Sequence, residues 1–262
     1  MLKYRIVDVF SERPFEGNGL CVVLDRCPEE LMQRIAREVN LSETTFPVQT
    51  GEHAYEMRIF TPTAELSFAG HPSLGTAWLM GPGRWTQTTS GGTVIVEADE
   101  RGATMTQPRP EFEQVDTEAA DVLAALRLSS ADAIYRSTAG GITHVLVATS
   151  EPIDRLDLDL GQIAEVSRAC RGLTLVPFRK VDDATLQARV FAPAAGVPED
   201  PGSGSAAGPI ALLARDVWGT GTEVTITMGT EIGRPSRIDV QTDDELRVGG
   251  RVAPCAEGHF LI

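Results

Sequence analysis

A repeat with a period of about half the sequence length constrains the fold of this chain more than any other feature. Residues 56–62 read EMRIFTP and residues 187–193 read QARVFAP, so a phenylalanine and a proline recur 131 positions further on. In both copies a helical pattern precedes this segment, and a glycine-rich loop with a proline and then an apolar run follow it. Four matched elements in the same order indicate two similar halves of mixed α and β structure.

Each half is expected to contain an amphipathic helix. Apolar residues recur at steps of three and four, the spacing of one helix face; they are Met32, Ile35 and Val39 in the first copy and Ile163, Val166 and Cys170 in the second. Glycines precede a strand in each half, at 17–19 and at 140–141. The polar run 109–117 marks the predicted boundary. It gives domains 1–115 and 116–262, with a last strand that can cross back into the first.

Charge and composition narrow the expected partners. With 23 Lys and Arg against 37 Asp and Glu, the net charge is −14 and no basic run occurs, so neither nucleic acid nor an anionic membrane is expected. The first strand is interrupted by charges and no apolar stretch is long enough to cross a bilayer, so we expect a cytoplasmic protein. Cysteines and histidines lack C-x-x-C and H-x-x-x-H spacing, which predicts reduced thiols and no metal site.

Two loops at related positions of the repeat share one pattern. In His71-Pro72 and in Asp200-Pro201, a polar residue precedes a proline, as at a helix N-cap followed by the first helical position. A helix N-terminus with free backbone amides attracts carboxylates and phosphates. One loop alone would be read as an ordinary capped helix. Two such loops, both flanked by small residues, predict a binding site for an anion.

Glu43 lies in the segment 40–46 (NLSETTF), between a predicted helix and a predicted strand. By composition alone it would be a solvated turn residue. When Phe46 is matched to Phe178, however, Leu175 stands opposite Glu43 in the repeat. A carboxyl in only one half is expected if Glu43 is an acid/base residue.

The sequence offers no binding motif for a common cofactor. Residues 202–208 (GSGSAAG) resemble a dinucleotide-binding fingerprint, but the third glycine comes one place late and no βαβ unit opens the chain. Neither a G-x-x-x-x-G-K-[ST] loop nor a G-x-S-x-G elbow occurs. We therefore expect a reaction without a cofactor.

Several spaced motifs follow in a fixed order along nearly the whole chain: 8–10 (DVF), 14–18 (PFEGN), 41–46 (LSETTF), 60–62 (FTP), 68–72 (FAGHP), 199–201 (EDP), 233–236 (GRPS) and 248–250 (VGG). In these motifs the sequence resembles the PhzF phenazine-biosynthesis family, which shares the diaminopimelate epimerase fold. The resemblance implies an α+β protein of two pseudo-symmetric halves. Each half would be a barrel-like sheet around a central helix, with the active site between the halves, and the protein would be a homodimer.

The resemblance also implies roles for individual residues. The glutamate of the family's S-E-T motif, which shuttles a proton, corresponds to Glu43, and the family's other site residues correspond to His71 and Asp200. Backbone amides at the two helix starts, around Gly70 and around Gly204 and Ser205, would hold a substrate carboxylate, with Ser42 nearby. The family's best-understood reaction isomerises a dihydro-hydroxyanthranilate, a cyclic diene amino acid.

Three functions follow from the sequence. The first is a cofactor-independent isomerase that shifts a proton and a double bond in a small, cyclic, unsaturated amino-acid-like carboxylate of secondary metabolism. The second is an amino-acid racemase or epimerase of the same fold, and the third is a non-catalytic member that binds a small molecule. No cysteine lies in either loop, which argues against a thiol-based racemase. The joint presence of Glu43, His71 and Asp200 argues against a non-catalytic protein.

Overall fold

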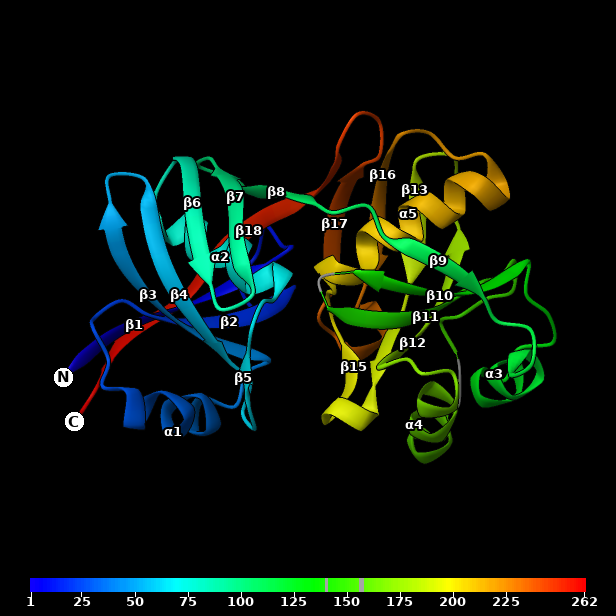
Figure 1. Ribbon diagram of the computed structural model, residues 1–262, viewed down its shortest axis with the longest axis horizontal. Coiled ribbons are helices and arrows are strands. Elements are labelled where there is room, and N and C mark those ends of the chain that lie inside the picture. The colour runs from blue at the N-terminus through cyan, green and yellow to red at the C-terminus, as the bar shows by residue number, and fades with distance from the viewer. Residues whose placement is uncertain (140, 156–157) are drawn as a thin grey trace. The chain divides into compact units, whose positions relative to one another are not determined.

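The computed structural model describes residues 1–139, 141–155 and 158–262 (Figure 1). It separates into two compact units. The first comprises Met1–Thr106 together with Gly249–Ile262, and the second comprises Gln107–Val248. The boundary predicted after residue 115 falls within the second unit, and the final segment of the chain belongs to the first. The predicted glycine turn at 140–141 lies partly outside the described residues, because residue 140 is not among them.

The first unit is a closed, eight-stranded barrel with α1 (Glu29–Val39) and α2 (Gly70–Met80). Neighbouring strands pair in the order β1, β2, β3, β4, β6, β7, β8, β18, and β18 pairs back to β1. The short β5 pairs with β4 outside this ring. The strands are β1 (Leu2–Val9), β2 (Asn18–Val23), β3 (Glu43–Gly51), β4 (Ala54–Phe60), β5 (Glu65–Leu66), β6 (Gly83–Thr89), β7 (Gly92–Ala98), β8 (Gly102–Gln107) and the long β18 (Leu246–Phe260), which begins in the second unit.

Helix α2 is the central helix of the first barrel. Its first eight residues are buried, as expected for a helix that is apolar or small on all sides. A Cβ atom at Gly75 would lie 2.7 Å from Leu20 Cδ2 and 2.8 Å from Val9 Cγ2, so the helix packs directly on β1 and β2. Helix α1 covers the other face of the sheet, where Met32 and Ile35 share a buried cluster with Phe46 and Phe60. The predicted amphipathic helix is thereby confirmed.

The second unit repeats this arrangement around α5 (Gly204–Trp218), which contacts β10, β11, β12, β16 and β17. Its other helices are α3 (Ala119–Leu126) and α4 (Leu160–Ala169), with the short 3₁₀ turns η1 (Pro193–Ala195) and η2 (Thr230–Ile232). Its strands are β9 (Glu111–Gln114), β10 (Ala133–Ala139), β11 (Ile142–Ala148), β12 (Thr174–Lys180), β13 (Thr185–Ala188), β14 (Val190–Ala192), β15 (Val197–Asp200), β16 (Glu223–Met228) and β17 (Ser236–Gln241).

The pairing of parallel strands confirms the sequence repeat. In the first unit, parallel β2 and β3 flank α1, and parallel β4 and β6 flank α2. In the second unit, parallel β11 and β12 flank α4, and parallel β13 and β16 flank α5. Each unit is thus built from the same two strand–helix–strand crossovers. The predicted α+β class, with two similar halves that each place a sheet around a central helix, is confirmed.

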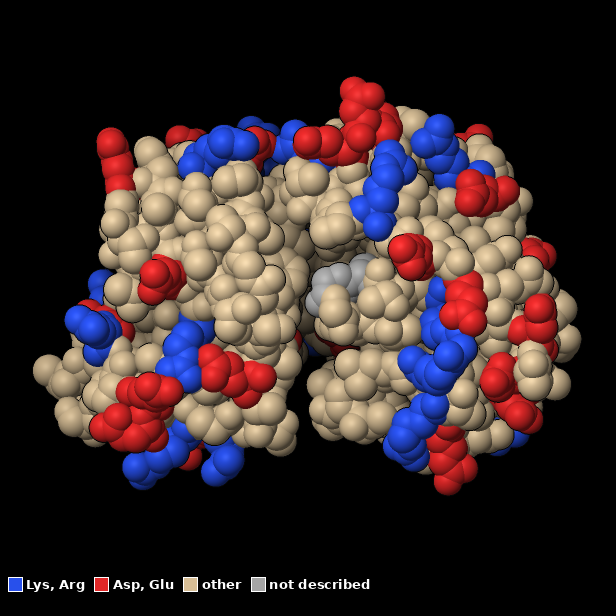
Figure 2. Space-filling view, in the orientation of Figure 1, with Lys and Arg blue, Asp and Glu red and all other residues tan. Residues whose placement is uncertain are grey.

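The face shown in Figure 2 carries acidic and basic groups intermingled on each unit, without a broad basic area. Among the described residues, no helix has the length and apolar character that a membrane span requires.

The turn between β1 and β2 depends on a glycine, which gives a testable prediction. Gly17 has φ +67°, and a Cβ atom there would lie 2.4 Å from the backbone oxygen of Val9. Gly219 has nearly the same φ, +65°, with nothing within 4 Å of that position. Gly219→Ala should therefore cost only the left-handed strain of about 1–2 kcal/mol. Gly17→Ala should cost about 1–3 kcal/mol more, because the backbone must also move.

Urea unfolding of both alanine variants measures this difference. Equal losses of unfolding free energy would show that the contact with Val9 does not constrain the turn.

Candidate active site

Two of the predicted catalytic residues lie side by side in the first unit. Glu43 begins β3 and His71 is the second residue of α2. A carboxylate oxygen of Glu43 lies 3.4 Å from Nδ1 of His71, and the two side chains are 15% and 6% exposed. Parallel pairing sets Leu20 beside Glu43, and the backbone of the preceding Gly19 hydrogen-bonds to the imidazole. The barrel therefore brings the side chains of Glu43 and His71 together at the start of its central helix.

The imidazole of His71 is neutral at physiological pH. Burial lowers its pKa to about 3, although the backbone hydrogen bond with Gly19 acts in the opposite direction. The contact with Glu43 is thus one between a carboxylate and a neutral ring rather than a salt bridge. Within the described part of the chain, Nε2 of His71 is buried and has no hydrogen-bond partner. A neutral imidazole held in this way can accept a hydrogen bond at its second nitrogen.

A buried chain of hydrogen bonds fixes the first turn of α2. The hydroxyl of Tyr55 donates to Gln87, the amide of Gln87 donates to Ser73, and the hydroxyl of Ser73 donates to the carbonyl of Ala69. Nearly one turn further along the helix, the hydroxyls of Thr45 and Thr76 lie 2.9 Å apart and join β3 to α2. These buried side chains satisfy one another's hydrogen bonds. They therefore fix the position of α2 relative to β3, and with it the position of His71 relative to Glu43.

Sequence reasoning missed this network. Its signal is a polar residue at an inward-facing strand position. Gln87 lies two residues after the buried Trp85, on the same inward face of β6, and is itself fully buried.

The predicted helix caps are wrong in both loops. Helix α2 begins at Gly70, its N-cap is Ala69, and His71 and Pro72 lie inside its first turn. Proline is tolerated there because the first amides of a helix have no intrahelical acceptor. Helix α5 begins only at Gly204, and its N-cap Ser203 makes no side-chain cap bond.

Asp200 therefore ends β15 instead of capping a helix. Its carboxylate accepts a hydrogen bond from the amide of Gly202 at 3.1 Å. A polar residue before proline fits a tight turn as well as a helix start, which explains the error.

The second unit holds the other predicted residues near the start of α5. The carbonyl of Gly204 accepts a hydrogen bond of 2.9 Å from the side chain of Gln107, and the hydroxyls of Ser203 and Ser205 lie 3.3 Å apart. Asp200 precedes them by a short turn. In the first unit, Gly70 is buried at the start of α2 and Ser42 is half-buried immediately before β3.

The strand register corrects the expected counterpart of Glu43. Leu175 pairs with Phe191 as Thr44 pairs with Phe60, so the residue equivalent to Glu43 is Thr174 and not Leu175. Side chains alternate between the faces of a strand, and a match that is one residue off exchanges the faces. Leu175 belongs to a buried cluster with residues of α3 and α4. The hydroxyl of Thr174 lies 2.8 Å from Nδ1 of the fully buried His144.

The two buried histidines predict a loss of stability in acid. Burial lowers the pKa of His71 to about 3 and that of His144 to about 4, from an ordinary value of 6.5. Below that ordinary value the unfolded chain binds protons that the folded chain cannot accept. The free energy of unfolding should therefore fall as the pH drops from about 6.5 toward 4, by up to about 1.4 kcal/mol per pH unit for each histidine.

Urea unfolding between pH 4.5 and 7.5 measures this slope. His144→Asn should make the slope shallower, and His259→Gln, at an exposed position, should leave it unchanged. Equal slopes in wild type and His144→Asn would contradict the prediction.

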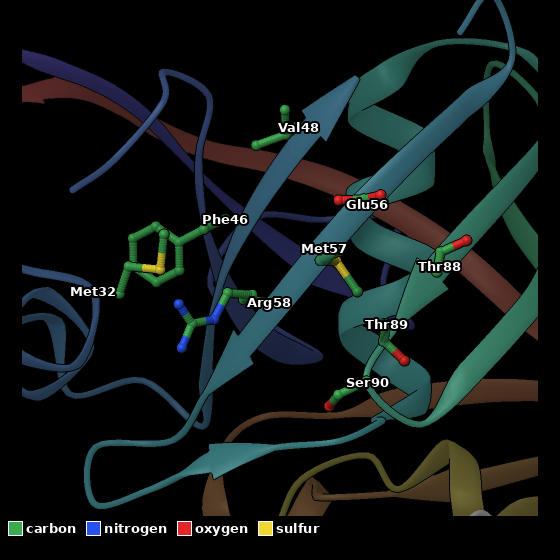
Figure 3. A pocket seen from close by; sticks show the side chains of 9 residues that line it. All are labelled: Met32, Phe46, Val48, Glu56, Met57, Arg58, Thr88, Thr89 and Ser90. Atoms are coloured by element: carbon green, nitrogen blue, oxygen red, sulfur yellow. The ribbon is translucent and has the colours of Figure 1, made fainter. Parts of the chain in front are cut away.

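A pocket of about 300 Å³ lies elsewhere on the first unit (Figure 3). It is formed by α1, the strands β3, β4 and β6 and the turn after β6, and none of the predicted site residues lines it. Its lining residues are Met32, Phe46, Val48, Glu56, Met57, Arg58, Thr88, Thr89 and Ser90. Among the described residues, no three His, Cys, Asp or Glu side chains are grouped so that they could hold a metal ion.

Known proteins are similar to this chain in sequence and in fold. A sequence profile described as "phenazine biosynthesis-like protein" (PhzC-PhzF) matches residues 7–258. The chain is 36% identical over 293 residues to a trans-2,3-dihydro-3-hydroxyanthranilate isomerase of Pseudomonas aeruginosa, with 100% of both chains covered.

Two solved structures agree with this match. A PhzF-family protein of Bacillus anthracis has a TM-score of 0.87 at 23% identity, covering 100% of this chain and 99% of that one. A "predicted epimerase" of Pseudomonas aeruginosa has a TM-score of 0.83 at 30% identity, with 100% of both chains covered. Fold and relatives together define an isomerase with the diaminopimelate epimerase-like architecture. The chain belongs to the PhzF family of phenazine biosynthesis-like proteins.

Proposed function

We propose that this protein is a cofactor-independent isomerase that shifts a proton and a double bond in a small, cyclic, unsaturated amino-acid-like carboxylate. The observation that supports this proposal most strongly is the carboxylate of Glu43 beside the neutral imidazole of His71, at the first turn of a buried helix. The substrate named for the Pseudomonas aeruginosa relative, trans-2,3-dihydro-3-hydroxyanthranilate, is the first candidate.

In the proposed mechanism, Glu43 removes a proton from one ring carbon and returns it to another. The conjugated system acidifies that C–H bond, so a single carboxylate is a strong enough base. His71 orients the carboxylate and a polar group of the substrate, and Asp200 orients a second polar group. Backbone amides at Gly70, and at Gly204 and Ser205, bind the substrate carboxylate, with Ser42 close to Glu43. Amides aimed at a carboxylate stabilise the charge that develops as the neighbouring C–H bond breaks.

An epimerase is the second candidate, supported by the 30% identical "predicted epimerase". Inversion at one carbon needs an acid/base group on each face of that carbon. The counterpart of Glu43 is Thr174, whose hydroxyl cannot take that role at neutral pH. His71 and Asp200 are the remaining pair, and burial makes His71 a weak base by lowering its pKa to about 3. These features favour proton relocation over inversion.

Deuterium incorporation separates the two functions. The protein is incubated in D₂O with trans-2,3-dihydro-3-hydroxyanthranilate, with other cyclic diene carboxylates and with free amino acids, and is followed by mass spectrometry, ultraviolet absorbance and optical rotation. Isomerisation gives uptake at one carbon together with a change in conjugation. Loss of optical rotation without a change in absorbance would establish the epimerase instead.

The absence of a cofactor-binding motif gives a further prediction. Dialysis against a chelator, followed by gel filtration, should leave turnover unchanged, because the proposed steps need only protein side chains and backbone amides. Loss of activity that a metal ion or NAD(P) restores would contradict the proposed mechanism. The homodimer implied by the family resemblance is tested separately, by light scattering of the purified protein.

A further inference from the structure

An arginine in the repeated segment contacts a glutamate and a phenylalanine in the same way in both units. In the first unit, Arg58 on β4 donates two parallel hydrogen bonds to the carboxylate of Glu65 on β5, with Nε and Nη2 at 2.7 and 2.8 Å. Its guanidinium carbon lies 5.2 Å from the ring centroid of Phe60. The third nitrogen, Nη1, lies 3.0 Å from Glu29. Figure 3 shows the Arg58 side chain extending away from β4.

The second unit contains the same arrangement. Arg189 donates two hydrogen bonds to Glu199 on β15, from Nε at 3.0 Å and from Nη2 at 2.7 Å. Its guanidinium carbon lies 4.9 Å from the ring centroid of Phe191, and Nη1 donates to the carbonyl of Ile153 at 3.1 Å. Arg58 and Arg189 are 131 positions apart, as are Phe60 and Phe191. We call each arginine, with its glutamate and phenylalanine, a clamp.

Both clamps hold the segment that leads into a central helix. Glu65 lies five residues before Gly70, where α2 begins, and the carbonyl of Ser67 between them accepts a hydrogen bond from the amide of Gly91 at 3.0 Å. Glu199 directly precedes Asp200, and α5 begins four residues later. The segments between the clamped glutamates and the proposed site residues are therefore short. Displacing Glu65 would move the start of α2 with His71, and displacing Glu199 would move the end of β15 with Asp200.

The two clamps differ in burial, which argues for a positional role. The side chains of Arg189 and Glu199 are 9% and 8% exposed, but those of Arg58 and Glu65 are 35% and 37% exposed. A partly exposed ion pair adds little to stability. Even so, two parallel hydrogen bonds from a guanidinium that lies over a ring restrict where the glutamate carboxylate can be. The planar guanidinium fixes both the direction and the distance of that carboxylate. The shared feature of the two clamps is thus geometry and not stabilisation.

We propose that Arg58 with Glu65, and Arg189 with Glu199, are positioning residues. They hold the first turn of α2, with His71, and the end of β15, with Asp200, in the geometry that turnover requires. This inference rests on the proposed function, which gives His71 and Asp200 their roles. Lysine carries the same charge as arginine, but its ammonium group is not planar. It cannot make the two parallel hydrogen bonds of a guanidinium or lay a flat group against a ring. Replacement by lysine therefore removes the geometry of a clamp and keeps its charge.

The test compares Arg58→Lys and Arg189→Lys with two controls. Arg84→Lys alters an arginine beside Glu97 on the first barrel, and Arg136→Lys alters an arginine that bonds Glu113 in the second unit. Neither of these arginines bonds to the segment that leads directly into a central helix. We measure three properties of each variant: the melting temperature, local hydrogen–deuterium exchange, and kcat and KM. The kinetic substrate is the one identified by the deuterium-incorporation experiment.

In the clamp variants, exchange should rise about tenfold, in residues 64–71 for Arg58→Lys and in 197–205 for Arg189→Lys. A misplaced catalytic group can cost about 10–100-fold in rate, so kcat should fall by that factor while KM changes little. Both controls should keep wild-type values. The partly exposed Arg58→Lys should fold even if Arg189→Lys does not.

Unchanged exchange in residues 64–71 and 197–205 of the clamp variants would overturn the proposal, whatever their activity. Raised exchange with a wild-type kcat would also overturn it. The clamps would then order these two segments in the wild type, but turnover would not depend on that order. Controls that behave like the clamp variants would show a general effect of losing arginine. A wild-type protein that converts none of the candidate substrates would count against the proposed function. Hydrogen–deuterium exchange in residues 64–71 and 197–205 would still decide whether the clamps hold these segments.

Discussion

Replacing Glu43 with glutamine is expected to lower turnover by about 10²–10⁴-fold, the usual contribution of a positioned acid/base group. Glutamine keeps the size and hydrogen-bonding shape of glutamate, but it cannot exchange a proton at a useful rate. The side chain stands beside His71, which is neutral, so no ion pair is lost. The melting temperature should therefore stay close to that of the wild type.

The matched control is Glu56→Gln, at an exposed position on the outer face of the same barrel. It should keep full turnover. If Glu43→Gln retains near-normal turnover with the same substrate, then Glu43 is not the proton carrier. Deuterium uptake by the variant decides between a slowed proton transfer and weaker binding, because slow transfer lowers uptake even at saturating substrate.

Removing the charge of Arg189 should have the largest effect on stability. Arg189→Met leaves the buried carboxylate of Glu199 without its partner, and breaking a buried pair in this way costs about 3–5 kcal/mol. The equivalent Arg58→Met exposes Glu65 and Glu29 to water, so the loss should be about 1 kcal/mol or less. The same chemical change at two related positions thus gives different losses.

Hydrogen exchange in increasing urea measures this contrast in each unit separately. Amides of β12 report on the second unit and amides of β3 on the first. The double variant Arg189→Met/Glu199→Leu should regain much of the lost free energy, because it removes the unpaired carboxylate as well. Similar losses for the two methionine variants would show that burial does not set the strength of the clamps.

The repeated architecture could be predicted because it depends on local patterns. The spacing of Met32 and Ile35 defines one helix face, and both residues are buried in the cluster beneath α1. The recurrence of Phe60 as Phe191 predicts a strand before the central helix in each half, and both residues lie on such strands. Glu43 and His71 could each be named as a site residue from the family motifs, but their contact could not, and the structure places them 3.4 Å apart.

The details that could not be predicted depend on register and on contacts between distant residues. Matching Phe46 to Phe178 gave the wrong counterpart of Glu43, since one residue of slip exchanges the two faces of a strand. The hydrogen bond from Tyr55 to Gln87 joins side chains 32 residues apart, and no spacing rule connects them. The pattern of a polar residue before proline does not distinguish a helix turn at His71 from a strand end at Asp200.

The way in which the first barrel closes sets an order for folding during synthesis. Strand β1 lies between β2 and β18, so this barrel is complete only when residues 249–260 have left the ribosome. The second unit is continuous in sequence and can be complete earlier. Until β18 arrives, β1 and β8 each have an unpaired edge, and such edges are templates for association with other chains. The half synthesised first is therefore the half that needs protection longest in the cell.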